Sequence, residues 1–235
     1  MEIPDTFFIT VFDYFVTIQD RQKNHFKCCP ASSEQEDIMS VLMSLMDFIP
    51  VILFIISSIT LQRCVYYRMS KGAFAVFSAG MIMIICSGIF KAIWKLFYSL
   101  GICDFERLNQ SFFPMQSVGF LLAGTATIAM VFFRQDNGEK LYQIGMPTVF
   151  SGTILFIAAN ILGSLGLCGG LAIESKRCGK VRPAVFFILS FFFLLTLGYL
   201  GTKDFTNASV NWTSEAVNIL AQIFFLLASK EFAKQ

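Results

Sequence analysis

Residues 38–62 read IMSVLMSLMDFIPVILFIISSITLQ, and Asp47 is the one charged residue among them. A stretch of roughly 20 predominantly apolar residues is long enough for an α-helix to cross the hydrocarbon core of a bilayer. Strands of a membrane barrel would instead be about ten residues long and would alternate apolar with polar positions. This stretch therefore predicts a transmembrane helix.

Five more stretches of comparable length and hydrophobicity follow along the chain of 235 residues. Hydrophobic residues make up 55% of the chain and charged residues 14%, a balance that soluble domains do not have. Because backbone groups in lipid must bond to one another, we predict an all-α, polytopic integral membrane protein with a six-helix transmembrane bundle. The further predicted spans are Gly72 to Leu100, Phe112 to Phe133, Ile144 to Ile173, Pro183 to Gly201 and Trp212 to Ser229.

The first 37 residues are expected to form a separate unit ahead of the bundle, which occupies residues 38–235. Apolar residues recur every three or four positions from Ile3 to Ile18, as on one face of an amphipathic helix. Carboxylates interrupt this stretch, and it is short for a span. We predict a helix that lies at the interface or against the bundle, with a seventh transmembrane helix as the alternative. Its role would be a structural cover, or else a gate or a docking element for a partner.

Basic residues are divided unequally between the two sides of a bundle whose six spans alternate in direction. Lysine and arginine are enriched in cytoplasmic loops. The side that holds both termini has twelve and the other has six, so we predict a plasma (inner) membrane protein with both termini in the cytoplasm. Arg63, Arg68 and Lys71 in the first loop oppose this orientation. The twelve are Arg21, Lys23, Lys27, Lys91, Lys95, Arg107, Lys176, Arg177, Lys180, Arg182, Lys230 and Lys234, and the other three of the six are Arg134, Lys140 and Lys203.

Ionisable residues inside predicted spans are costly to keep in lipid and are therefore candidate site residues. Asp47 lies within the first span, and Lys91 and Lys95 lie one turn apart in the second. In an antiparallel hairpin of these two spans, an ion pair between Asp47 and Lys91 is geometrically feasible. The alternative is that the two lysines extend to the headgroups beside Trp94, as long cationic side chains do near interfaces.

Uncharged and acidic polar residues form a second candidate set. Gln116 lies in the third predicted span and Asn160 in the fourth. Glu215, Asn218 and Gln222 in the last span follow spacings of three and four, so they share one face of a helix. Such a face is expected to point into the bundle, where it either bonds helix to helix or binds a polar substrate or ion.

A proline, four glycines and two short sequence repeats predict where helices break and how the spans are related. Pro114 is predicted to begin or break the third helix, because proline has no backbone N–H. The tripeptide Ala-Val-Phe occurs at residues 75–77 and again at 184–186, and Asp-Phe occurs at 104–105 and 204–205. These matches hint at two halves of three spans each, which would be inverted relative to one another if the spans alternate. Four glycines are predicted to loosen the end of the fourth span, namely Gly163, Gly166, Gly169 and Gly170.

Signatures of catalysis and of cofactor binding are scarce. His25 is the sole histidine, which leaves no His-based metal site or acid–base pair to build. The seven cysteines include no Cys-x-x-Cys pair. No cofactor or metal is expected, and a net charge of +2 gives no reason to expect a nucleic-acid partner.

Three functions remain, in decreasing order of support. The first is a transporter, channel or substrate-binding membrane subunit for a small polar solute or ion. The second is a membrane sensor or assembly subunit that acts through protein partners. The third is an intramembrane lipid-modifying enzyme, which the thin acid–base inventory disfavours. The expected partners are the lipid bilayer, a small polar ligand, and a second copy or another membrane subunit.

Overall fold

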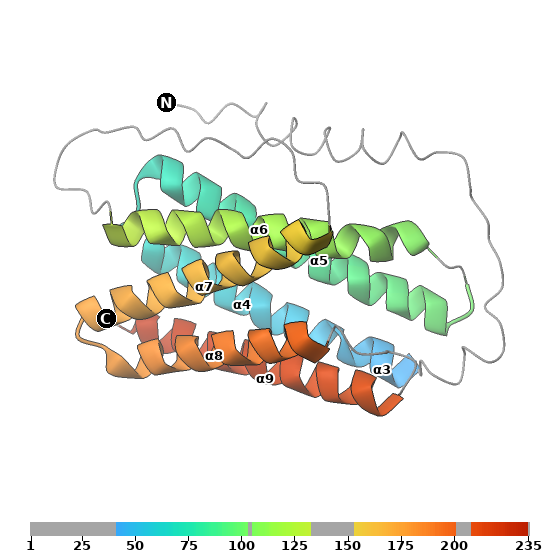
Figure 1. Cartoon of the computed structure of the whole chain (residues 1–235). Helices are drawn as coiled ribbons and strands as arrows, with labels where there is room; N and C mark the ends of the chain where they lie inside the picture. The colour runs from blue at the N-terminus through green and yellow to red at the C-terminus, as the bar shows by residue number, and fades with distance from the viewer. Residues whose placement is uncertain (1–40, 103–104, 133–152, 201–207, 235) are drawn as a thin grey trace. The chain divides into compact units, whose positions relative to one another are not determined.

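The computed structural model describes residues 41–102, 105–132, 153–200 and 208–234, which are almost entirely helical (Figure 1). The predicted N-terminal helix at residues 3–18 and the predicted start of the fourth span at Ile144 lie outside these ranges. The helices are α3 (Val41–Met46), α4 (Phe48–Val65), α5 (Lys71–Ser99), α6 (Glu106–Phe132), α7 (Thr153–Arg177), α8 (Val181–Leu200) and α9 (Ala208–Ala233).

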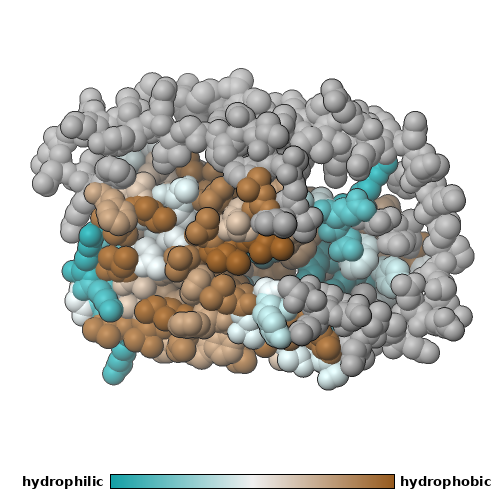
Figure 2. All heavy atoms as spheres, in the orientation of Figure 1, coloured by the Kyte–Doolittle hydropathy of each residue, from teal (hydrophilic) through white to brown (hydrophobic). Residues whose placement is uncertain are grey.

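Six helical segments in the described part of the chain are long and apolar enough to cross a membrane, which confirms the six predicted stretches. The first of them, Val41–Val65, comprises both α3 and α4. In the segment Val181–Leu200 only 22% of the apolar stretch is buried inside the bundle, so most of its side chains face outward. Figure 2 shows brown, apolar side chains between teal, hydrophilic ones at the two ends of the visible face. These features are those of a multi-pass membrane protein.

Two local predictions, that Pro114 begins or breaks the third helix and that glycines loosen the end of the fourth span, differ from the structure. Pro114 lies inside α6, which begins eight residues earlier at Glu106. Transmembrane helices tolerate an internal proline when neighbouring groups compensate for the lost backbone bond. The glycine-rich end of the predicted fourth span is regular helix, since α7 continues to Arg177.

The glycines of α7 serve close packing instead of loosening the helix. A Cβ atom at Gly163 would overlap the backbone of Phe120 and Leu121 in α6, and one at Gly170 would lie 2.6 Å from the Thr127 side chain. On α5, a Cβ atom at Gly80 would lie 2.6 Å from the backbone nitrogen of Ala123. Small residues at such positions let helix backbones approach closely, which is a main source of helix association in membranes.

Helices α6 and α7 run in the same direction. Contacts between them advance together along both chains, because Gly163 lies against Phe120, Gly170 against Thr127, and Arg177 donates a hydrogen bond to the Val131 carbonyl. By contrast, α5 and α6 are antiparallel, since Gly80 meets Ala123 whereas Ile84 meets Gly119. The end of α6 and the described start of α7 therefore lie at opposite ends of the bundle (Figure 1).

This parallel pair determines how the two sets of three helices are related. Helices α4, α5 and α6 alternate in direction, and so do α7, α8 and α9, but α4 and α7 start at the same end of the bundle (Figure 1). The two sets therefore run in the same sense, whereas the inverted arrangement predicted from alternating spans requires opposite senses. As a result α4 and α9 are parallel, with Phe54 stacked on Phe225 at 5.6 Å between ring centroids.

Candidate functional site

Three charged side chains from different helices meet inside the bundle. The ammonium Nζ of Lys95 on α5 lies 2.7 Å from Oδ2 of Asp47 and 2.7 Å from Oε1 of Glu215 on α9. The exposed fractions of these residues are 5% for Asp47, 8% for Lys95 and 6% for Glu215. We call this group the triad.

Asp47 occupies the break between α3 and α4. Pro50 follows three residues later and has no N–H to donate to the carbonyl of Met46, so α3 ends there and a new helix starts at Phe48. Ser44 fixes the register of α3 against α5, because its hydroxyl donates to the Lys95 carbonyl at 3.1 Å and lies 3.0 Å from the Ser99 hydroxyl oxygen. The break therefore presents Asp47 to the turn of α5 that carries Lys95.

The net charge of the triad depends on the protonation of its carboxyl groups. Two carboxyl groups flank one ammonium and hydrogen-bond to each other, so the triad carries one net negative charge when both are ionised and none when the proton of the Asp47–Glu215 hydrogen bond is present. Leaving a buried charge uncompensated is strongly unfavourable, and Lys91, one turn from Lys95 on α5, is a second cation that interacts electrostatically with both carboxyl groups.

Two buried oxygen atoms of α9 have no hydrogen-bond partner among the described residues, namely Oγ of Ser214 and Oε1 of Gln222. Glu215 and Gln222 are seven residues apart on α9, so Gln222 continues the face that carries Glu215 two turns further along the helix. Buried polar atoms are nearly always bonded in proteins, so these oxygens are candidate contacts for a ligand.

The sequence-predicted residues divide into those that join the triad and those that do not. Asp47 pairs with Lys95 and not with Lys91, whose ammonium lies over the Phe112 ring, 4.7 Å from its centroid. The predicted Asp47–Lys91 pair is therefore wrong by one helical turn. Asn218 is half-buried, one turn from Glu215. Gln116 on α6 and Asn160 on α7 are half-buried and form no hydrogen bond or ion pair with the triad within the described ranges.

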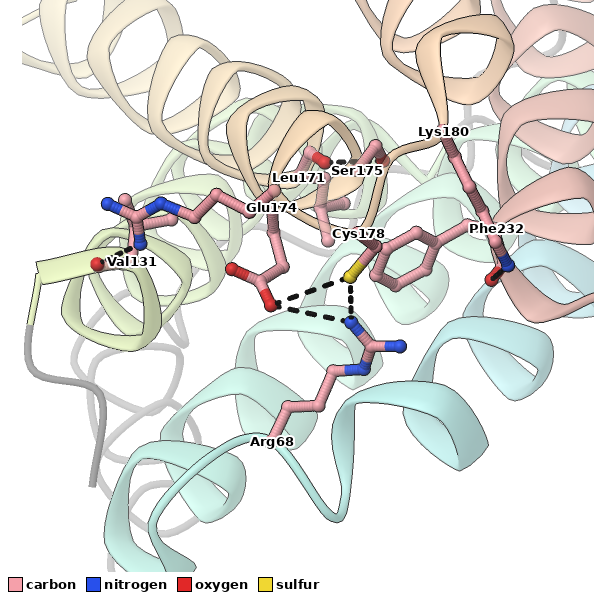
Figure 3. A network of polar contacts seen from close by, with 9 residues as sticks. Arg68, Val131, Leu171, Glu174, Ser175, Cys178, Lys180 and Phe232 are labelled. Atoms are coloured by element: carbon pink, nitrogen blue, oxygen red, sulfur yellow. Dashed lines mark hydrogen bonds and ion pairs between the residues drawn. The ribbon is translucent and has the colours of Figure 1, made fainter. Parts of the chain in front are cut away.

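A second charged cluster, not predicted from the sequence, lies at the other end of α4 (Figure 3). Nη1 of Arg68, in the turn after α4, lies 3.4 Å from Oε1 of Glu174 and donates to the Cys178 sulfur. The same guanidinium stands over the Phe232 ring, 4.9 Å from its centroid. Lys180 donates to the Phe232 carbonyl at 3.2 Å. Glu174 was overlooked because it directly follows the predicted end of the fourth span, where an acidic residue is expected to reach water.

Removal of Arg68 is expected to destabilise the bundle because Glu174 is only 5% exposed. The Arg68→Leu variant should lose about 1–3 kcal/mol of unfolding free energy, the usual cost of a buried polar group left without its partner. Adding Glu174→Gln should recover part of that loss. The free energies are measured by SDS titration in mixed micelles, with exposed Arg63→Leu as the control. Equal losses in Arg68→Leu and Arg63→Leu would contradict the pairing.

Metal-binding geometry is absent from the described ranges, where no group of three or more His, Cys, Asp or Glu side chains is placed to hold an ion. Comparison of the chain with protein family models, with curated proteins and with solved structures finds no match.

Proposed function

We propose that this chain is a small multi-pass membrane transporter, channel or substrate-binding membrane subunit, and that its triad binds a proton or a small cationic solute. The observation that carries the proposal is the position of two buried carboxylates around one ammonium, with Lys95 2.7 Å from both Asp47 and Glu215. Intramembrane groups of this kind are rare and mark ion or substrate pathways.

The unpartnered atoms support a cationic or hydrogen-bond-donating ligand. An amide oxygen accepts hydrogen bonds and does not donate them, and this holds for Oε1 of Gln222. An anionic solute would be repelled by the triad, whereas a proton or a small cation would neutralise its excess charge. The face that runs from Glu215 through Asn218 to Gln222 would then continue the polar path along α9.

A binding experiment on the detergent-purified protein tests this proposal. Equal concentrations of sodium, potassium, ammonium and choline chloride are compared with N-methylglucamine chloride for their effect on the melting temperature. At least one small cation should raise the melting temperature of the wild-type protein, since a ligand that binds the folded state stabilises it by mass action. Asp47→Asn and Gln222→Leu should each remove this increase.

Thr196→Val is the matched control. Thr196 is an exposed polar residue of α8 whose hydroxyl bonds within its own helix to the Phe192 carbonyl at 3.0 Å, so its side chain faces away from the bundle interior. It should keep the full cation response. A wild-type protein that responds to no cation and co-purifies with another membrane subunit would instead support the sensor or assembly function.

A further inference from the structure

Within the residues that the structure describes, the two ends of the bundle differ in their exposed positive charge. The parallel packing of α6 and α7 brings the ends of α4, α6, α7 and α9 and the starts of α5 and α8 together, as the contacts of Arg68, Arg177 and Lys180 demonstrate. We call this the basic end. Its exposed basic side chains come from α4, α5, α7, α8 and α9, and they include Arg63, Lys71, Lys176, Arg177, Arg182 and Lys230.

The opposite end presents little positive charge. Among the residues that the structure describes there, Lys95 is buried in the triad, Lys91 lies over the Phe112 ring, and Arg107 is half-buried. Aromatic residues typical of the membrane interface are exposed at both ends. Tyr67 is 89% exposed at the basic end, and Tyr199 is 61% exposed at the opposite end. Charge therefore distinguishes two ends that otherwise have the same interfacial character.

We propose that the basic end binds anionic phospholipid headgroups at the cytoplasmic face of the membrane, so that the triad lies toward the extracytoplasmic side. Cytoplasmic leaflets carry anionic lipids, which attract clustered lysine and arginine. The same bias sets the orientation of multi-pass proteins. In this arrangement Arg63, Arg68 and Lys71 lie on the same side as the basic turn between α7 and α8, whereas Lys91, Lys95 and Arg107 lie on the other side. The start of α4 is then extracytoplasmic, which differs from the predicted orientation with both termini in the cytoplasm.

The arrangement also sets the depth of the triad. Asp47 lies six residues after Val41, where the first span begins, and Lys95 lies four residues before the end of α5. At about 1.5 Å per residue, the triad lies roughly 6–9 Å inside the extracytoplasmic boundary. A ligand from outside the cell would therefore reach the triad by a short path, and one from the cytoplasm by a long path. The proposed orientation does not depend on the proposed function.

Cysteine labelling in intact cells tests the orientation. In a variant in which the other cysteines are replaced, native Cys178 is the exposed reporter at the basic end, and Ile102→Cys, at a position 63% exposed, reports the opposite end. A membrane-impermeant maleimide should label Ile102→Cys in intact cells and Cys178 only after permeabilisation. The wild-type chain provides a second measurement, because a fluorescent protein fused after Gln235 should fluoresce while an alkaline phosphatase fusion should be inactive.

Lipid binding is tested on the full chain in nanodiscs. Discs that contain phosphatidylglycerol should raise the melting temperature above that in pure phosphatidylcholine, and high salt should remove the difference. The triple variant Lys176→Gln, Arg177→Gln, Arg182→Gln should lose most of this increase, whereas Arg107→Gln should keep it. Labelling of Cys178 in intact cells, or an undiminished lipid effect in the triple variant, would overturn the proposal.

Discussion

The Lys95→Met variant is expected to lose about 3–5 kcal/mol of unfolding free energy, the usual cost of breaking a buried ion pair by removing one partner. Without Lys95, Asp47 and Glu215 lose the ammonium that lies 2.7 Å from each of them. The two buried carboxyl groups then have no ammonium bonded to them. The loss is measured by SDS titration of the purified protein in mixed micelles at neutral pH.

Neutralising the carboxylates should reverse most of this loss. The triple variant Asp47→Asn, Lys95→Met, Glu215→Gln removes all three charges, and replacing a buried ionic group as a whole is often neutral or even stabilising. Lys71→Met is the matched control, because it removes an exposed lysine at the other end of the same helix. A triple variant as unstable as Lys95→Met would show that the loss comes from packing and not from unpaired charge.

The sequence was sufficient to predict the fold class because the signal is local. Each predicted span is a continuous apolar run, and the structure has a helix that is apolar and long enough at all six places. The candidate residues Asp47, Lys95 and Glu215 were also recognisable, since each is an ionisable group in an apolar run. Identifying them required only the energetic cost of charge in lipid.

The assembly of the triad was not predictable, because it depends on helix direction. If six spans alternate, the first and last run oppositely, and Asp47 and Glu215 then fall in opposite halves of the membrane. They meet because α4 and α9 are parallel, which follows from the parallel packing of α6 on α7. That packing depends on close approach at Gly163 and Gly170, whose contacts cannot be read from glycine spacing alone. The choice of Lys95 over Lys91 is a matter of register, which the Ser44 hydroxyl sets from α3.

Helix α9 joins the two sets of three helices at both of its ends. Near its start, Glu215 bonds to Lys95 of the first set, and near its end the Phe232 ring contacts the Arg68 guanidinium. In the middle, the Phe225 ring lies 5.6 Å from that of Phe54 on α4. Movement of one set against the other would therefore have to break a charged cluster at one end of the bundle or the other.

The Gly163→Ala variant is expected to lose about 1–3 kcal/mol of unfolding free energy, the usual cost of overpacking a close contact. A Cβ atom at this position would overlap the backbone of Phe120 and Leu121, which cannot move aside as the end of a flexible side chain can. The α6–α7 contact would have to widen, and it is the contact that sets the parallel direction of the two sets of helices. The free energy is measured by SDS titration in mixed micelles.

The same glycine-to-alanine substitution at Gly198 on α8 should change the unfolding free energy in the opposite direction. A Cβ atom at Gly198 has nothing within 4 Å, so Gly198→Ala removes backbone freedom without a clash. Alanine is favoured over glycine inside a helix by up to about 1 kcal/mol, so this variant should be as stable as the wild-type protein or slightly more stable. The difference between the two variants therefore isolates the helix contact from helix propensity. If Gly163→Ala is stabilised as much as Gly198→Ala, α6 and α7 do not pack in parallel through this glycine, and Asp47 and Glu215 lose the topology that brings them together.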